Sequence, residues 1–261
     1  MIEVDDLACK FGDFEAVKGI SFRVAPGEIF AFLGPNGAGK TTTIKMLTTL
    51  LKPTRGSIRI DGLNPTSHSS DVRRRFGIVF QDPSLDIVLT AMENLQLHAA
   101  LYGVPRGQRH ERIEKLLRQF ELWEKRDQVT ATFSGGMKRR LEIARGFLHT
   151  PKVLFLDEPT LGLDPQSRHQ LWNHVRAVNQ AEGVTVFLTT HYMDEAERVA
   201  QRIAIVDHGS IVAMGTLAEL KAQTGTESLE AAFLKLTGTT VRDEAASSAD
   251  QMRQFMKSWR R

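Results

Sequence analysis

The sequence predicts an α/β fold built around a mostly parallel sheet, and three observations lead to this prediction. Four apolar runs of four or five residues are continuous, which is typical of strands buried on both faces of a parallel sheet. Three segments early in the chain alternate between apolar and polar residues, as half-buried strands do. The middle of the chain has helical periodicity without a strand signal. We therefore expect an α/β core with a small antiparallel strand set early in the chain and a helical insertion in its middle.

The same patterns place the expected elements along the chain. The alternating strands are residues 2–4, 20–24 and 57–60, and the continuous apolar strands are residues 29–33, 153–156, 184–188 and 203–206. Residues 91–126 and 136–149 are expected to be helical. Within the first of these, Ile113, Leu116 and Leu117 have the spacing of one packing face on an otherwise solvated helix.

The composition is that of a globular protein. The chain has 261 residues, of which 41% are hydrophobic and 25% charged, and these values disfavour disordered, collagen-like and disulfide-rich classes. No apolar run approaches the roughly 18 residues that a membrane-spanning helix needs. The first six residues lack the basic-then-apolar order of a signal peptide, and the single cysteine, Cys9, suits a reducing compartment.

The net charge is concentrated near one end of the sequence. The chain has 34 Lys and Arg against 31 Asp and Glu, a formal charge of +3. Residues 250–261 carry this whole excess, so residues 1–249 sum to zero. The body of the chain therefore lacks the basic excess typical of nucleic-acid-binding proteins, and we expect no nucleic-acid partner.

A glycine-rich segment predicts a phosphate-binding loop. Residues 34–41 match G-x-x-x-x-G-K-[ST] at every fixed position, between a buried strand and a helical segment. The glycines allow backbone N–H groups to converge on phosphate oxygens, and the helix N-terminus favours anionic charge. Lys40 would reach the β- and γ-phosphates, and the Thr41 hydroxyl would bind Mg²⁺. The expected phosphate-binding residues are Gly34, Pro35, Asn36, Gly37, Ala38, Gly39, Lys40, Thr41 and Thr42.

Two adjacent carboxylates predict the hydrolytic chemistry. Asp157 and Glu158 directly follow the apolar run at residues 153–156. Successive residues of a strand point to opposite sides, so the two acids are expected to have different roles. Asp157, at the strand end, suits Mg²⁺ and its water shell, and Glu158 is placed to orient or deprotonate the attacking water.

An octapeptide upstream of the two acids points to a family. Residues 133–140, Phe-Ser-Gly-Gly-Met-Lys-Arg-Arg, resemble the L-S-G-G-Q signature loop of ATP-binding cassette (ABC) ATPases. The resemblance covers about residues 1–236, with the family's other motifs in their usual order. They are the Q-loop glutamine at Gln81, the D-loop at Asp164, the switch histidine at His191, and an adenine-stacking aromatic at Phe11 with Val17 beside it.

This resemblance implies a P-loop NTPase fold with MgATP as the bound nucleotide. Ser134, Gly135 and Gly136 would contact ATP bound to a second subunit, so that two ATP molecules are sandwiched in a head-to-tail homodimer. Asp164 is counted among the nucleotide-binding residues. The implied catalytic residues are Lys40, Gln81, Glu158 and His191, and the implied metal ligands are Thr41, Gln81 and Asp157.

Two positions depart from the family pattern. Met137 replaces the usual signature glutamine and Phe133 replaces leucine, but Ser134 and both glycines are kept, so we expect ATPase activity. We interpret Phe133 as an apolar anchor of the loop. The methionine, together with the segments at residues 189–197 and 205–216, is similar to bacterial exporter ATPases of the daunorubicin type.

The resemblance implies an ATP-binding and ATP-hydrolysing subunit that powers a separately encoded permease, an exporter of drugs, lipids, polysaccharides or ions. Such a subunit is peripheral, at the cytoplasmic face of the inner membrane, and contacts the membrane through the permease. Two alternatives stay open. An ABC importer subunit has the same catalytic motifs. A soluble ABC ATPase outside transport usually carries two cassettes or a long coiled coil, and neither is recognisable in this sequence.

The resemblance also sets the expected domain boundaries. We expect an ATPase domain at residues 1–236, with its helical subdomain at about residues 85–148, followed by a linker and basic tail at residues 237–261. Met252, Phe255, Met256 and Trp259 fall on one helical stripe of the tail. That stripe suits contact with a membrane or partner, and equally a locally packed terminus. The histidines other than His191 are expected on the surface and not as metal ligands.

Overall fold

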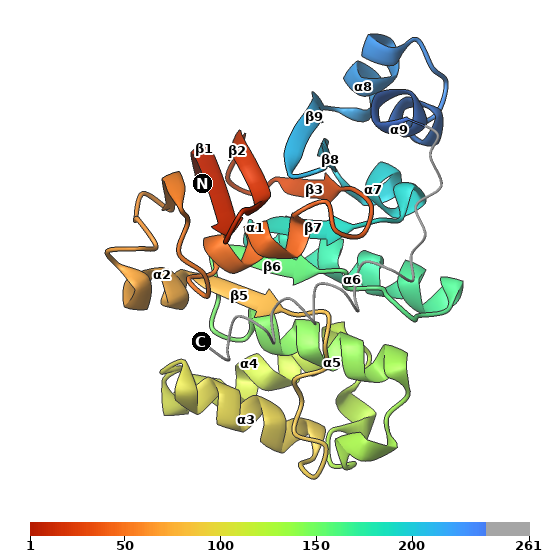
Figure 1. Cartoon of the computed structure of the whole chain (residues 1–261). Coiled ribbons are helices and arrows are strands. Elements are labelled where there is room, and N and C mark those ends of the chain that lie inside the picture. Colours follow the sequence, from red (N-terminus) through yellow and green to blue (C-terminus); the bar gives the residue numbers. More distant parts are fainter. Residues whose placement is uncertain (239–261) are drawn as a thin grey trace.

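Two β-sheets form the framework of residues 1–238, the part of the chain that the computed structural model describes (Figure 1). The predicted tail at residues 250–261 lies outside this part. The small sheet is antiparallel and consists, in spatial order, of β2 (Phe14–Val24), β1 (Ile2–Phe11) and β4 (Arg55–Ile60). The central sheet consists, in spatial order, of β5 (Phe76–Val79), β6 (Val153–Asp157), β7 (Thr185–Thr190), β3 (Ile29–Leu33), β8 (Arg202–Asp207) and β9 (Ser210–Gly215).

All neighbouring strands of the central sheet are parallel except β8 and β9, which form an antiparallel pair. The α/β prediction is therefore confirmed, and so is the antiparallel strand set early in the chain. The expected strands at residues 29–33, 153–156, 184–188 and 203–206 all belong to the central sheet.

The continuous apolar strands are buried on both faces of the central sheet, as expected for parallel strands. In β3, Ile29, Ala31 and Leu33 join a core that packs against the helices, whereas Phe30 and Phe32 join a second core beneath the small sheet. The second core holds a cluster of rings, with Phe22, Phe30, Phe32 and Phe187 at centroid distances of 5.5–5.8 Å. The alternating direction of strand side chains thus divides one strand between two cores.

The helices lie mainly around the central sheet, with one group forming a separate layer. α1 (Lys40–Leu47) follows β3, and α2 (Ser69–Arg75) precedes β5. α6 (Pro165–Glu182) and α7 (Met193–Val199) connect strands of the central sheet, and α8 (Leu217–Thr224) and α9 (Leu229–Thr237) follow β9 at one end of the molecule (Figure 1). The separate layer consists of α3 (Ala91–Leu101), α4 (Arg106–Gln119) and α5 (Gly135–Phe147).

The prediction of helix over residues 91–126 is wrong at two places, because the chain turns between α3 and α4 and because α4 already ends at Gln119. Gly103 has a φ of 70°, and Pro105 occupies the residue before α4. A left-handed glycine ends a helix readily, and proline provides a fixed φ for the next start. The predicted packing face of α4 is confirmed, since Ile113, Leu116 and Leu117 are fully buried.

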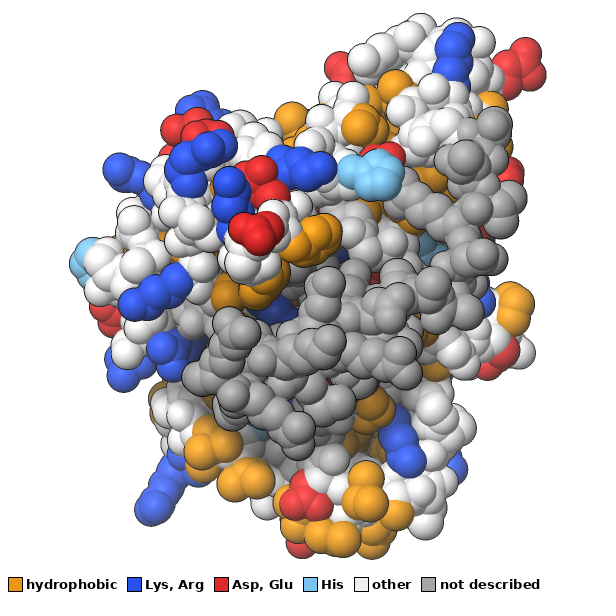
Figure 2. Space-filling view, viewed as in Figure 1, with side chains coloured by type: hydrophobic (Ala, Val, Ile, Leu, Met, Phe, Trp, Pro, Cys, Tyr) orange, Lys and Arg blue, Asp and Glu red, His pale blue; other side chains and the backbone are white. Residues whose placement is uncertain are grey.

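Side chains of different kinds gather on different parts of the surface in Figure 2. Charged side chains cluster over the region of the small sheet, and hydrophobic ones gather at the lower edge, over the separate helical layer. In and before α3, Val88 and Leu101 are 72% and 73% exposed, and Ile87 and Leu97 are also exposed. Within residues 1–238, no helix is both long and apolar enough to cross a membrane.

Candidate functional site

The predicted site residues meet where three adjacent strands end. β6, β7 and β3 are neighbours in the central sheet, and their carboxyl ends lie at the same edge (Figure 1). The phosphate-binding loop follows β3, His191 follows β7, and Asp157 is the last residue of β6. In open parallel sheets this edge is the usual ligand-binding edge, because the loops that follow the strands converge there.

The glycine-rich loop is closely packed at two of its glycines. A Cβ on Gly34 would lie 2.3 Å from the carbonyl oxygen of Val206, and a Cβ on Gly39 would lie 2.7 Å from that of Ala16. Gly39 also has a φ of 99°, a conformation that strains any other residue. Gly39 is the residue before α1, so the loop leads directly into the N-terminus of a helix. Such an N-terminus favours a bound phosphate.

Lys40 lies folded into this loop. Its side chain is 6% exposed, and its Nζ donates to the carbonyl oxygens of Gly34 (2.7 Å) and Pro35 (3.2 Å). The same Nζ lies 3.0 Å from Glu158 Oε1. A buried ammonium thus stands between the loop and the second acid, where it can meet a bound anion.

Asp157 and Thr41 form an oxygen-rich corner beside Lys40. The Thr41 hydroxyl lies 3.3 Å from Asp157 Oδ1, and the Thr189 hydroxyl donates to the same oxygen at 2.6 Å. Burial raises the pKa of Asp157, and these two hydrogen bonds act in the opposite direction without cancelling it. Hydroxyl and carboxylate oxygens are ligands that Mg²⁺ prefers, so this donor set fits the predicted ion.

Glu158 is held in a left-handed backbone conformation. Its φ is 47°, and its N–H donates to both the carbonyl oxygen and the hydroxyl of Thr189. His191 Nδ1 donates to Glu158 Oε2 at 2.8 Å, since a carboxylate can only accept. Burial raises the pKa of Glu158, but the hydrogen bond from His191 and the charge of Lys40 outweigh it, so this pKa lies below its usual value. Glu158 is therefore a carboxylate at neutral pH.

The signature loop forms the exposed start of α5. The Ser134 hydroxyl accepts from the N–H of Met137, and Gly135 is exposed. Gly136 faces α6 closely, because a Cβ there would lie 2.9 Å from Ser167 Oγ. Phe133 is 4% exposed within the helix-facing core, which confirms its interpretation as an anchor.

Asp164 caps α6 next to this loop. One of its oxygens accepts from the N–H of Ser167 at 2.9 Å, and the other accepts from the Ser167 hydroxyl at 2.6 Å. These bonds hold the pKa of Asp164 below its usual value. The predicted D-loop residue is thus a helix cap that neighbours the signature loop.

The remaining predicted residues lie outside this cluster of charged groups. Gln81 is exposed in the loop after β5, and Phe11 is 47% exposed at the end of β1. Val17 is buried against the phosphate loop, with its Cγ2 only 3.4 Å from the position of a Cβ on Gly39. The structure therefore brings Lys40, Thr41, Asp157, Glu158 and His191 together.

Sequence reasoning missed three residues that hold this site. Thr189 bonds to both acids, and its position two residues before His191 on a buried strand was a usable signal. Arg139 and Glu142 form a buried ion pair of 3.0 Å on α5. Charged residues three apart on an otherwise apolar helix face are the sequence signal for such a pair.

The expectation of surface histidines is wrong for three of them, since His98, His149 and His174 are half-buried. The rings of His98 and His149 each stack with Tyr102, at centroid distances of 4.4 and 4.2 Å, and lie 6.1 Å from each other. Burial, with the nearby Arg145 charge, lowers the pKa of His98 to about 3, so it is neutral. Among the described residues, no group of three or more His, Cys, Asp or Glu side chains could hold a metal ion.

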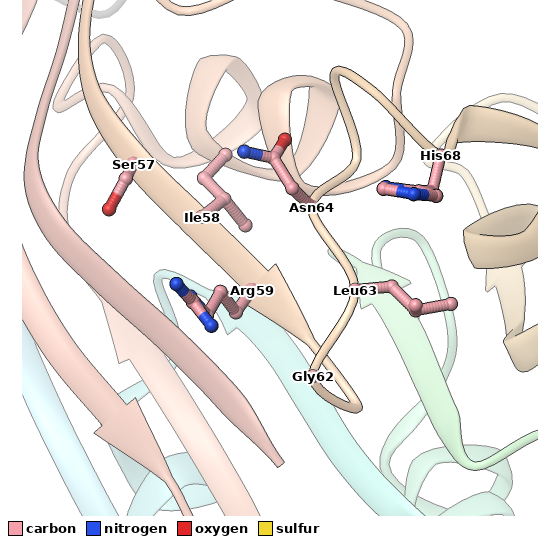
Figure 3. A pocket seen from close by; sticks show the side chains of 7 residues that line it. All are labelled: Ser57, Ile58, Arg59, Gly62, Leu63, Asn64 and His68. Carbon is pink, nitrogen blue, oxygen red and sulfur yellow. The ribbon is translucent and has the colours of Figure 1, made fainter.

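A separate hollow of about 270 Å³ lies beside β4 (Figure 3). Its walls come from β4 and from the segment that leads to α2, and Asn64 and His68 belong to that segment. None of its lining residues belongs to the phosphate loop or to the acid pair. The hollow is therefore separate from the cluster of charged groups at the strand ends.

The fold and the site define a phosphate-binding ATPase class, and comparison with known proteins gives the family. Residues 17–161 match the family model described as ABC transporter. The chain belongs to the ABC transporter family. The predicted family and the P-loop NTPase fold are thereby confirmed, and the chain is an ATP-binding, ATP-hydrolysing subunit that works with a separate transmembrane permease.

Several relatives match over most of the chain. The daunorubicin/doxorubicin resistance ATP-binding protein DrrA of Streptomyces peucetius is 46% identical over 94% of this chain and 73% of its own length. The Nod factor export ATP-binding protein I of Ralstonia nicotianae is 41% identical over 84% of this chain and 68% of its own length.

Solved structures agree with this assignment. An ATP-binding subunit of an ABC transporter has a TM-score of 0.82 at 35% identity, covering 90% of this chain and 99% of that one. The dimeric post-hydrolysis cassette MJ0796, bound to ADP and Pi, has a TM-score of 0.74 at 27% identity, covering 83% of this chain and 99% of that one. Both are cassettes of the predicted kind, and the second is a dimer.

Proposed function

We propose that this chain hydrolyses MgATP with Glu158 as general base and so powers an exporter. The observation that carries the proposal is the buried group in which Lys40 Nζ and His191 Nδ1 each lie within 3.0 Å of a Glu158 oxygen. A carboxylate kept ionised next to a phosphate-binding loop can accept a proton from water. The resistance and export functions named for the relatives support an outward direction of transport.

Each residue of the site has a distinct task in this proposal. Lys40 binds the β- and γ-phosphates, for which it would leave Glu158. His191 would likewise turn from Glu158 to donate a hydrogen bond to the γ-phosphate, and Glu158 then orients and deprotonates the attacking water. Thr41 and Asp157, with Gln81, would hold Mg²⁺, which neutralises phosphate charge when bound.

Further residues of this chain would complete the nucleotide site. Phe11 and Val17 would bind the adenine, and Ser134, Gly135 and Gly136 would contact ATP on a second copy of the chain. The exposed start of α5 supports this assignment, because its N-terminus is free to face an anion. The proposed assembly is a head-to-tail homodimer with two sandwiched nucleotides, peripheral to the membrane that holds the permease.

The variant Glu158→Gln tests the assigned base. We expect it to bind ATP and to form the dimer, while turnover falls by about 10²-fold or more, because the amide cannot accept the proton. ATP turnover, equilibrium ATP binding and size-exclusion chromatography with MgATP are the measurements. Glu121→Gln is the control, since Glu121 is exposed and pairs with Arg140 away from the site. Turnover of E158Q within about two-fold of the unmodified chain would refute the role of Glu158.

A further inference from the structure

A buried arginine on the helix that begins with the signature loop binds the backbone of the hydrolytic segment. Arg139 lies in the first turns of α5 and is 7% exposed. Its guanidinium donates to the carbonyl oxygens of three successive residues, Asp157 (3.4 Å), Glu158 (3.1 Å) and Pro159 (2.5 Å). A guanidinium has five N–H donors in one plane and can therefore reach several carbonyl oxygens at once. A lysine ammonium has only three donors on a single nitrogen and cannot make the same set of hydrogen bonds.

The bound segment is the turn that contains the strained residue. Glu158 has a φ of 47°, which a residue with a Cβ keeps only where its surroundings hold it. This turn directs the carbonyl oxygens of residues 157–159 toward Arg139, while the Glu158 carboxylate lies beside Lys40 and His191. Because the carbonyls and the carboxylate share one backbone, fixing the carbonyls also fixes where the carboxylate points.

The same guanidinium reaches the loop that contains Gln81. Its Nη1 donates to the carbonyl oxygen of Phe80 at 2.6 Å and to Glu142 Oε2 at 3.0 Å. The other Glu142 oxygen accepts from the N–H of Ser84 at 2.6 Å. One buried ion pair therefore holds the residues on both sides of Gln81 and, at the same time, the turn at Glu158.

We propose that Arg139 is a positioning residue for ATP hydrolysis, which holds the Glu158 turn and ties it to the Gln81 loop through Phe80 and Glu142. The proposal rests on the proposed role of Glu158 as base. Arg139 touches neither nucleotide nor water in this scheme. It acts on the direction of the Glu158 carboxylate, so its removal should lower kcat and leave ATP binding intact.

If Arg139 only stabilised the fold, its replacement would affect stability and not specifically kcat. Arg112 provides the matched control for this alternative. Arg112 is a largely buried arginine of α4 that donates to the carbonyl oxygens of Phe147 and Leu148 and to both oxygens of Glu182. It has the same kinds of partner as Arg139, but none of them belongs to the phosphate loop, the acid pair or the Gln81 loop. Loss of stability alone should therefore affect Arg112 and Arg139 variants alike.

The test compares Arg139→Lys and Arg139→Gln with Arg112→Lys and Arg112→Gln in the full chain. ATP turnover, equilibrium ATP binding and thermal unfolding are measured for each. We expect R139K and R139Q to lose about ten-fold or more in kcat with KM and the ATP Kd within about two-fold, because a displaced catalytic group costs rate rather than binding. The R112 variants should keep kcat at temperatures where they are folded.

Two results would overturn the proposal. One is a kcat of R139K within about two-fold of the unmodified chain, and the other is a kcat loss in R112K equal to that in R139K. Should R139Q not fold, R139K decides the question, since it keeps the positive charge and removes only the planar set of N–H donors. If E158Q loses turnover while R139K does not, only the role of Arg139 is refuted, whereas turnover by E158Q refutes the proposed base itself.

Discussion

At the scale of single residues, the site depends on a threonine that bonds to both acids. Thr189 donates to Asp157 Oδ1 and accepts from the N–H of Glu158. It is fully buried on β7, between the strand of the acids and the strand of the phosphate loop. Its hydroxyl therefore links Asp157, the proposed Mg²⁺ ligand, to Glu158, the proposed base, although Thr189 belongs to neither motif.

Replacing Thr189 by valine should remove the hydrogen bonds through which its side chain links Asp157 and Glu158. We expect Thr189→Val to lose about ten-fold in kcat and to need more Mg²⁺ for half-maximal turnover, because Asp157 loses a donor and the N–H of Glu158 loses one of its two acceptors. Thr185→Val is the control, since Thr185 is equally buried on β7 and accepts from the N–H of Gly27 at 2.9 Å. The idea fails if both variants have the same magnesium dependence as the unmodified chain.

The motif residues could be predicted from the sequence, whereas the residues that hold them could not. Lys40, Asp157 and Glu158 occupy positions that a spacing pattern describes, because phosphate binding demands glycines and a lysine in a fixed order. Arg139 and Thr189 act through contacts with segments that are distant along the chain, at residues 157–159. Such contacts depend on strand order and helix placement, which a local pattern does not contain.

At the scale of elements, an ion pair ties α4 to α6. Arg112 donates to both oxygens of Glu182 at 2.9 and 2.7 Å, and Lys115 donates to the same carboxylate at 2.9 Å. Burial raises the pKa of Glu182, but these bonds and charges outweigh it, so its pKa lies below the ordinary 4.5. The separate helical layer is thereby joined to a helix that packs on the central sheet.

This pair predicts a specific loss of stability in acid. A carboxylate whose pKa is lowered by folding stabilises the protein fully above its unfolded value of 4.5, and the effect disappears as the pH falls through the lower folded value. Glu182→Gln should therefore lower the unfolding temperature at pH 7, and the difference from the unmodified chain should shrink below pH 4.5. Unfolding monitored at several pH values measures this. A difference that is constant with pH would contradict it.

Element types were predictable from the sequence, and element ends were less so. The runs at residues 29–33 and 153–156 were expected strands, because continuous apolar residues suit a sheet covered on both faces. The break between α3 and α4 was missed, although Gly103 and Pro105 are the residues that cause it. The helical spacing of apolar residues can continue in phase across a short turn. Periodicity alone then does not reveal where one helix ends and the next begins.

At the scale of the whole molecule, the described part of the chain presents apolar side chains where a partner can cover them. Val88, just before α3, and Leu101, the last residue of α3, are among the most exposed large hydrophobic residues. Figure 2 shows hydrophobic side chains gathered over the helical layer. Exposed apolar groups that gather in one region mark interaction surfaces. Because the chain works with a separate permease, we expect the permease to bind there.

Charged substitutions should separate permease binding from nucleotide binding. Val88→Asp combined with Leu101→Asp should reduce co-purification of the chain with its permease by about ten-fold or more, while the ATP Kd of the isolated chain stays unchanged. Leu234→Asp is the control, since Leu234 is 43% exposed on α9, at the other end of the molecule (Figure 1). Equal recovery of permease with the double variant and the control would rule out this surface.

The strand order of the central sheet has a consequence for what can vary in this chain. β6, β7 and β3 are consecutive, so the segments that carry Asp157, His191 and Lys40 are spaced by the distance between hydrogen-bonded strands, about 4.8 Å at each step. Backbone hydrogen bonds fix that spacing, so a side-chain replacement that keeps those bonds keeps the spacing. The spacing of the strands therefore determines how far apart the segments that carry the reacting groups lie. We therefore expect sequence differences that accompany a different cargo to lie outside the three strands that carry the site.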